Sequence, residues 1–145
     1  MRKALLLFAV LGLAGSLWAA DPIIGTWKLN IAKSVIIQTD LKERTEAYRE
    51  IEGDQIERSS GPFVTHTWPR QGGMAKIQFP GSEGITFVQT LIAPGEWYVT
   101  TMRNGKQISV RHKVISKDGK TMTQTYKGTD SEGKPFEQLE VYDKQ

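Results

Sequence analysis

The chain has 145 residues, with 19 lysines and arginines, 16 aspartates and glutamates and no cysteine, so its formal net charge is +3. The lack of cysteine excludes disulfides, thiol catalysis and cysteine-ligated metal sites. Basic residues are scattered among acidic ones, with no basic run and no aromatic RNA-binding motif, so no nucleic-acid partner is expected.

Residues 1–20 predict a secretory signal peptide. Arg2 and Lys3 precede a short apolar stretch, and small residues follow it up to Ala19 and Ala20. A charged start, a short apolar centre and a small-residue exit are the three parts of such a leader. The apolar stretch is shorter than the roughly 20 residues of a membrane-spanning helix, which makes an uncleaved anchor the weaker alternative. We therefore expect an exported protein, periplasmic or secreted, without a stable membrane anchor after processing.

Residues 21–145 are expected to form one domain of short strands. Asn104-Gly105 and Asp118-Gly119 are typical of tight hairpins, because such turns need positive φ. Eight to ten antiparallel strands joined by short turns favour a single up-and-down barrel, which leaves no free sheet edge. A two-sheet sandwich is the alternative. The alternation of apolar and polar residues places the strands at 23–29, 43–51, 54–59, 63–68, 74–79, 85–92, 96–102, 106–115, 120–127 and 135–143.

Both histidines lie on apolar strand faces. His66 shares a face with Trp68, and His112 shares one with Val110 and Val114, so both are expected to point into the barrel. Such positions would suit a haem or a metal, but the sequence shows no third ligand. We favour two side chains hydrogen-bonded to barrel threonines, with no metal and no cofactor.

Glutamates recur along the predicted strands and raise the question of a hydrolytic acid pair. A catalytic pair needs one carboxyl group in an apolar setting, and glutamates spread over strand faces usually lie in solvent. No serine lies in a nucleophile elbow, and no glycine loop leads into a helix to cradle phosphate. We therefore expect no enzyme and mostly solvated carboxylates at Glu43, Glu46, Glu50, Glu57, Glu137 and Glu140.

The stretch Gly25-Thr26-Trp27-Lys28-Leu29 resembles the Gly-x-Trp signature of the calycins, which include lipocalins and intracellular fatty-acid-binding proteins. The resemblance implies a barrel closed at one end by Trp27, with a glycine that allows a close approach. Both chain ends are also similar to small exported bacterial proteins described as lipocalin-like. Lipocalins usually stack an arginine on this tryptophan, and here only Lys144 or Arg111 remains for that role.

The last predicted strand departs from the pattern it resembles. Fatty-acid-binding proteins hold the ligand carboxylate with an arginine two residues before a tyrosine, whereas this chain has Glu140 two residues before Tyr142. The resemblance implies that both side chains face inward, with Gln138 beside them. A buried unpaired carboxylate is costly, so we expect Glu140 either to be protonated or to accept from a donor such as His112 or a ligand amine. The same charge would repel an anionic ligand.

Aromatic residues are more numerous than a small barrel needs to seal its ends. They favour a cavity for one small hydrophobic molecule, although a packed interior stays open. We predict an exported, non-catalytic binding module; the alternative is a periplasmic or secreted interaction or inhibitor domain that binds a protein through its outer surface. The residues predicted to contact the ligand are Trp68, Phe87, Trp97, His112, Tyr126, Glu140 and Tyr142.

Overall fold

The computed structural model describes residues 20–37 and 43–145, so the predicted leader lies outside the described residues except for Ala20. The described residues include no helix that is long and apolar enough to cross a membrane. The expected all-β fold is confirmed. Its elements are β1 (Gly25–Leu29), η1 (Ile31–Lys33), β2 (Thr45–Ile51), β3 (Gln55–Ser60), β4 (Phe63–Pro69), β5 (Gly73–Met74), β6 (Lys76–Ile77), β7 (Ile85–Ala93), β8 (Glu96–Arg103), β9 (Lys106–Ile115), β10 (Thr121–Thr129) and β11 (Pro135–Lys144).

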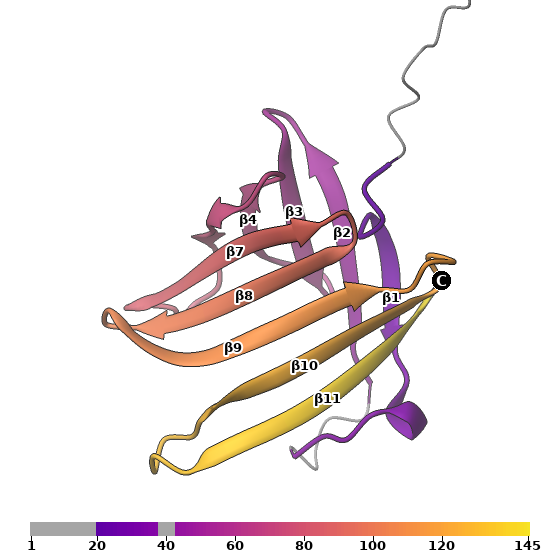
Figure 1. Ribbon diagram of the computed structural model, residues 1–145. Coiled ribbons are helices and arrows are strands. Elements are labelled where there is room, and N and C mark those ends of the chain that lie inside the picture. The colour runs from indigo at the N-terminus through magenta and orange to yellow at the C-terminus, as the bar shows by residue number, and fades with distance from the viewer. Residues whose placement is uncertain (1–19, 38–42) are drawn as a thin grey trace, which may run out of the picture.

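All the strands belong to one antiparallel sheet that curls into a nearly closed barrel. Its order is β5-β7-β8-β9-β10-β11-β1-β2-β3-β4-β6, so neighbours in sequence are mostly neighbours in space. Figure 1 shows two walls that cross each other: β7 to β11, from red to yellow, and β1 to β4, from indigo to magenta. The predicted up-and-down barrel is confirmed, and the two-sheet sandwich is not what the chain forms.

The predicted strand at 74–79 is instead a bridge between the two walls. Gly73 and Met74 pair with β7, whereas Lys76 and Ile77 pair with β4. Ala75 lies between the two pairings, and its backbone N–H donates to the carbonyl of Phe87. The segment thus changes its pairing partner from β7 to β4 at a single residue. This change divides the predicted strand into β5 and β6 and connects the two edges of the sheet.

Trp27 fills one end of the barrel, as the Gly-x-Trp resemblance implies. Its indole is fully buried and donates to the Ile23 carbonyl at 2.8 Å. The Lys144 ammonium lies 5.0 Å from the centre of the ring, so the expected lysine replaces the missing arginine. Gly25 has φ +138°, and a Cβ there would lie 2.7 Å from the Cε atom of Lys144. The glycine therefore makes room for this lysine side chain.

His66 lies within the aromatic core. Its ring centre is 5.1 Å from those of both Trp68 and Phe87. Its Nδ1 atom lies 3.1 Å from the Thr65 hydroxyl, which confirms the expected threonine partner, and its Nε2 atom lies 3.4 Å from the Gln89 amide nitrogen. Burial, reinforced by the charges of nearby basic groups, lowers the pKa of His66 to about 2. The imidazole is therefore neutral at physiological pH.

Replacing Trp27 with alanine should lower the free energy of unfolding by about 3–5 kcal/mol, because a large aromatic side chain is removed from a packed end of the barrel. Phe63→Ala is the control: its side chain is 71% exposed and the change should cost well under about 1 kcal/mol. Urea unfolding followed by tryptophan fluorescence and circular dichroism measures both. A Trp27→Ala protein that unfolds at the parent's urea concentration would contradict the plug.

Stability should fall as the pH drops from 7 to 5. The pKa of His66 in the folded chain lies below its value of about 6.5 in the unfolded chain. Between these two values the unfolded chain binds a proton at His66 and the folded chain does not. The stabilisation is present above pH 6.5 and is lost below it, by about 2 kcal/mol at pH 5. Urea unfolding at pH 7, 6 and 5 should show this slope in the parent and in His112→Gln but not in His66→Gln. An unchanged slope in His66→Gln would contradict the assignment.

Candidate functional site

A cavity of about 430 Å³ lies within the open end of the barrel, at the end away from Trp27. Its rim consists of Ile37, Asp130 and Phe136, and its inner surface of Arg44, Arg111, Tyr126, Gln138 and Glu140. A second cavity of about 190 Å³ lies deeper, beside His66, Phe79 and Phe87. Arg111 lines both, so the two cavities meet at its side chain.

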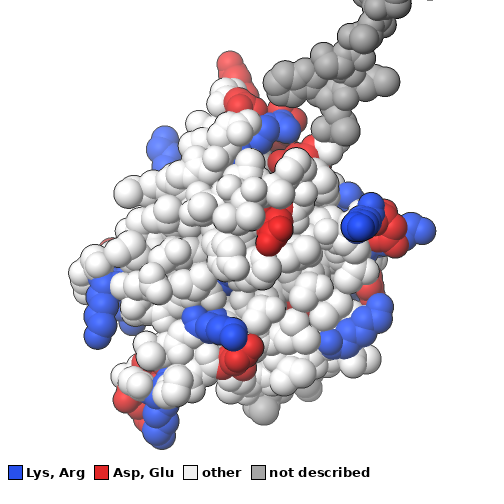
Figure 2. Space-filling view, in the orientation of Figure 1, with Lys and Arg blue, Asp and Glu red and all other residues white. Residues whose placement is uncertain are grey.

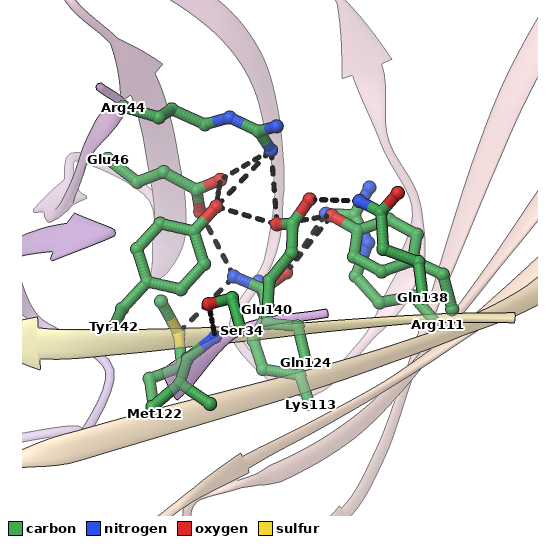
Figure 3. Close-up of polar contacts among 12 residues, drawn as sticks. Ser34, Arg44, Glu46, Arg111, Lys113, Met122, Gln124, Gln138, Glu140 and Tyr142 are labelled. Atoms are coloured by element: carbon green, nitrogen blue, oxygen red, sulfur yellow. Dashed lines mark hydrogen bonds and ion pairs between the residues drawn. The ribbon is translucent and has the colours of Figure 1, made fainter. Parts of the chain in front are cut away.

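Glu140 points into the barrel with its carboxylate fully surrounded by donors. Alternation along β11 turns Gln138, Glu140 and Tyr142 inward, as expected. The carboxylate accepts hydrogen bonds from Arg44 at 3.1 Å, Tyr142 at 2.7 Å and the Gln138 amide at 2.6 Å. Figure 3 shows these groups converging. The expectation of His112 as donor is wrong, because the compensating charge comes from Arg44.

Glu46 is the second carboxylate inside the barrel and is fully buried. Two nitrogens of Arg58 donate hydrogen bonds to the Glu46 carboxylate, at 2.5 and 3.2 Å, and the Tyr48 hydroxyl donates a third at 2.6 Å. Burial alone would raise the pKa of Glu46, but the charge and hydrogen bonds of Arg58 hold it well below its usual range. The Tyr142 hydroxyl lies 3.0 Å from Glu46 and 2.7 Å from Glu140, so its single proton can be donated to either carboxylate but to only one at a time.

Lys113 lies behind this network on the inward face of β9. Its ammonium nitrogen is 2.8 Å from the Tyr48 hydroxyl, and the side chain is almost completely buried. Burial lowers the pKa of Lys113 well below its usual range, although the charge of Glu46 opposes the shift. Lys113 lines neither of the two cavities.

Arg111 differs from Lys113 in that its side chain lines both cavities. Its guanidinium stacks 4.1 Å from the centre of the Tyr126 ring and donates to the Gln124 amide oxygen at 3.3 Å. Its Nε atom is buried without a hydrogen-bond partner in the described part of the chain. Within those residues Glu46 pairs with Arg58 and Glu140 with Arg44, whereas no carboxylate forms an ion pair with Arg111. Its charge thus faces both cavities.

Six of the seven predicted ligand residues lie inside the barrel, in three groups: those that line the outer cavity, the one that lines the inner cavity and those buried outside both cavities. Tyr126 and Glu140 line the outer cavity, Phe87 lines the inner one, and Tyr142 is fully buried beside Glu140. Trp68 and Trp97 are also fully buried, but they line neither cavity.

His112 lies on the outer face of the barrel, and the expectation that it points inward is wrong. Its ring stacks on Tyr98 with centres 4.5 Å apart, and its Nε2 atom lies 2.8 Å from a Glu96 oxygen. The inward positions of β9 are Arg111, which stacks on Tyr126, and Lys113, which donates to the Tyr48 hydroxyl. Apolar residues therefore face outward on this strand, opposite to what its hydropathy indicates.

Three interior arginines were not predicted to belong to the site: Arg44, Arg58 and Arg111. The expectation that Glu46 lies in solvent is also wrong. The alternation of Glu46 with Tyr48 along the predicted strand 43–51 was a usable signal, since residues two apart share a face. For Arg44 the sequence offered no signal, because its carboxylate partner Glu140 lies 96 residues away along the chain. Arg58 lies 12 residues from Glu46, and Arg111 has no carboxylate partner among the described residues.

Comparisons with known proteins support the fold. No family model matches the chain, and no curated protein does. Zebrafish ileal bile acid-binding protein complexed with cholic acid matches with a TM-score of 0.60 and 12% identity, over 86% of this chain and 99% of its own. The Schistosoma mansoni fatty acid binding protein in complex with arachidonic acid matches with a TM-score of 0.57 and 14% identity, over 86% and 96%.

A third solved structure, the extracellular fatty acid binding protein As-p18, has a TM-score of 0.50 and 15% identity, over 86% of this chain and 97% of its own. At such low identities the likeness concerns the fold. The chain therefore has the barrel fold of fatty-acid- and bile-acid-binding proteins, with its own set of charged residues inside.

Proposed function

We propose that this chain is an exported, non-catalytic module that binds a small hydrophobic molecule with an acidic group. The observation that carries the proposal is Arg111, a cation without a carboxylate partner among the described residues, located where two cavities meet. A ligand carboxylate would supply the missing negative charge. Phe136 and Ile37 at the rim and Tyr126 inside offer apolar surface to the rest of the molecule.

Size and charge agree with such a ligand. A volume of about 430 Å³ falls within the range of roughly 300–1,000 Å³ typical of small-molecule sites. The two inward carboxylates each have an arginine partner, so the repulsion expected from Glu140 is offset by Arg44. Two solved proteins with this fold are complexed with cholic acid and arachidonic acid, which supports an acidic amphiphile here as well.

The interior is poorly suited to acid–base catalysis. A general base works best with a pKa near the working pH, whereas the pKa of His66 is about 2. Glu46 and Glu140 are each engaged by an arginine and a tyrosine hydroxyl. Lys113, whose pKa burial lowers, lines neither cavity. The interior therefore favours binding without chemistry.

Binding of lauric acid, lauryl alcohol and laurylamine below their aggregation concentrations tests the acidic head group. The parent should bind the acid most tightly, and Arg111→Gln should weaken the acid about 10- to 100-fold while leaving the alcohol nearly unchanged, because one charged hydrogen-bonding partner is lost. Arg103→Gln, an exposed arginine at the end of β8, is the matched control and should bind like the parent. Isothermal titration calorimetry gives the affinities.

Two outcomes of this titration would count against the proposal. A parent that prefers the amine or the alcohol would contradict the acidic head group. A parent that binds none of the three molecules would contradict the binding function itself.

Export is tested by expressing the whole chain in a bacterium with a general secretion system. The charged start and small-residue exit of residues 1–20 should lead to cleavage after Ala19 or Ala20 and release of the domain. N-terminal sequencing of the periplasmic protein measures the cut, and Leu7→Arg, which interrupts the apolar centre, should abolish it. Protein that retains Met1 in the membrane fraction would argue for an anchor.

A further inference from the structure

The outer wall over β7 to β10 is unusually poor in charge. Figure 2 shows it as a largely white surface, with most blue and red residues around its margin. The opposite wall differs: on β1 to β3, Lys28 is exposed and Arg49 pairs with Glu57 across the strands. Monomeric proteins rarely expose large apolar patches, and charged residues are depleted at the cores of protein–protein interfaces.

A row of directly opposed residues crosses this wall. Met74 lies opposite Val88, Val88 opposite Thr100, Thr100 opposite Val110 and Val110 opposite Lys127. Directly opposed residues share a face of the sheet. This row points outward, because the adjacent positions Gln89 and Val99 are buried and Arg111, next to Val110, lines the interior cavities. We call these five residues the central row.

The two ends of the central row differ in shape. Met74 protrudes at one end, where it is 70% exposed. At the other end the surface is hollowed by about 420 Å³. The hollow is lined by Tyr98, Val110, His112, Thr125, Lys127 and Glu137. One wall thus carries both a projecting apolar side chain and a recess that can receive one.

Thr100 stands at the middle of the central row, two strands from Met74 and two strands from Lys127. Both separations are therefore about 10 Å, at roughly 4.8 Å per strand. Consider a two-fold axis that lies between two facing copies, passes over Thr100 and runs along the strands. It places Met74 of each copy over the hollow of the other, and Val88 of each copy against Val110. In such an isologous contact one patch meets itself.

We propose that this wall is a homodimer interface with its two-fold axis at Thr100. The charges allow it: Lys127 and Glu137 lie 3.3 Å apart at the hollow, so their opposite charges offset each other there. The size is also adequate. Four strands of eight to ten residues span roughly 19 by 30 Å, or about 600 Å² in projection, comparable with the ~800 Å² that each partner of a standard interface buries. Tyr98, half-exposed beside the hollow, is of a type enriched in interfaces.

Sedimentation velocity of the processed protein over a range of micromolar concentrations tests the dimer. The parent should show a reversible monomer–dimer equilibrium. Thr100→Lys places two like charges together at the axis and should raise the dimer dissociation constant at least about a hundredfold. Thr26→Lys changes an exposed strand threonine on the opposite wall and should leave the constant within about twofold. Met74→Ala should weaken the dimer by removing the side chain that enters the hollow.

Cross-linking locates the axis independently, because the chain has no cysteine of its own. Packed sheets lie about 10 Å apart, so a short bismaleimide should join Thr100→Cys into a covalent dimer and should leave Thr26→Cys monomeric. Circular dichroism and thermal unfolding should match the parent for every variant used. A parent that is monomeric throughout, a dimer that survives Thr100→Lys, or cross-links at position 26 in place of position 100 would each overturn the proposal.

Discussion

The buried carboxylate of Glu46 imposes the main constraint on the interior of this barrel. A carboxylate removed from water is costly unless donors surround it. Arg58 on β3, Tyr48 on β2 and Tyr142 on β11 meet that requirement together. A slip of one residue in any of these strands would turn its side chain to the other face and leave a charge unpaired. The ion pair and its hydroxyl partners thus oppose alternative registers of β2, β3 and β11.

The same requirement organises the open end. Glu140 shares the Tyr142 hydroxyl with Glu46 and takes Arg44 as its own counter-ion. Once both carboxylates are matched, the charge of Arg111 remains at the junction of the two cavities. The charge of Arg111 thus lies inside a low-dielectric barrel without a carboxylate partner among the described residues. The site therefore depends on Arg44 and Arg58, which neutralise Glu140 and Glu46, as much as on Arg111 itself.

The barrel carries charge inside and a largely uncharged wall outside over β7 to β10. On β9 the inversion is plain: Arg111 and Lys113 face the interior, whereas Val110 and His112 face outward. The inward charges contact side chains of two kinds: Arg111 meets Tyr126 and Gln124 on the adjacent β10, and Lys113 meets Tyr48 on the other wall. Outward apolar residues need a separate explanation, and contact with a second copy supplies one. The two surfaces of a single strand would then serve two different associations, one with a ligand and one with another chain.

Much of the architecture was already determined by the sequence alone. Period-two alternation, the Asn104-Gly105 and Asp118-Gly119 turns and the Gly25–Trp27 signature suffice for an antiparallel barrel with a plugged end. They suffice because strand pitch and turn geometry are local properties. The inward orientation of Glu140 followed from the resemblance of the last strand.

Only the tertiary structure decided which face of each strand is inside and where the sheet closes. Alternation defines two faces without saying which one is buried, and hydropathy chose the wrong face on β9. It did so because the cost of burying Arg111 or Glu46 depends on partners on other strands. The bridge at 73–77 is of the same kind, since its split follows from two edges that meet only in the folded barrel. Compensation of buried charge and closure of a sheet are non-local, and they appear only when distant segments come together.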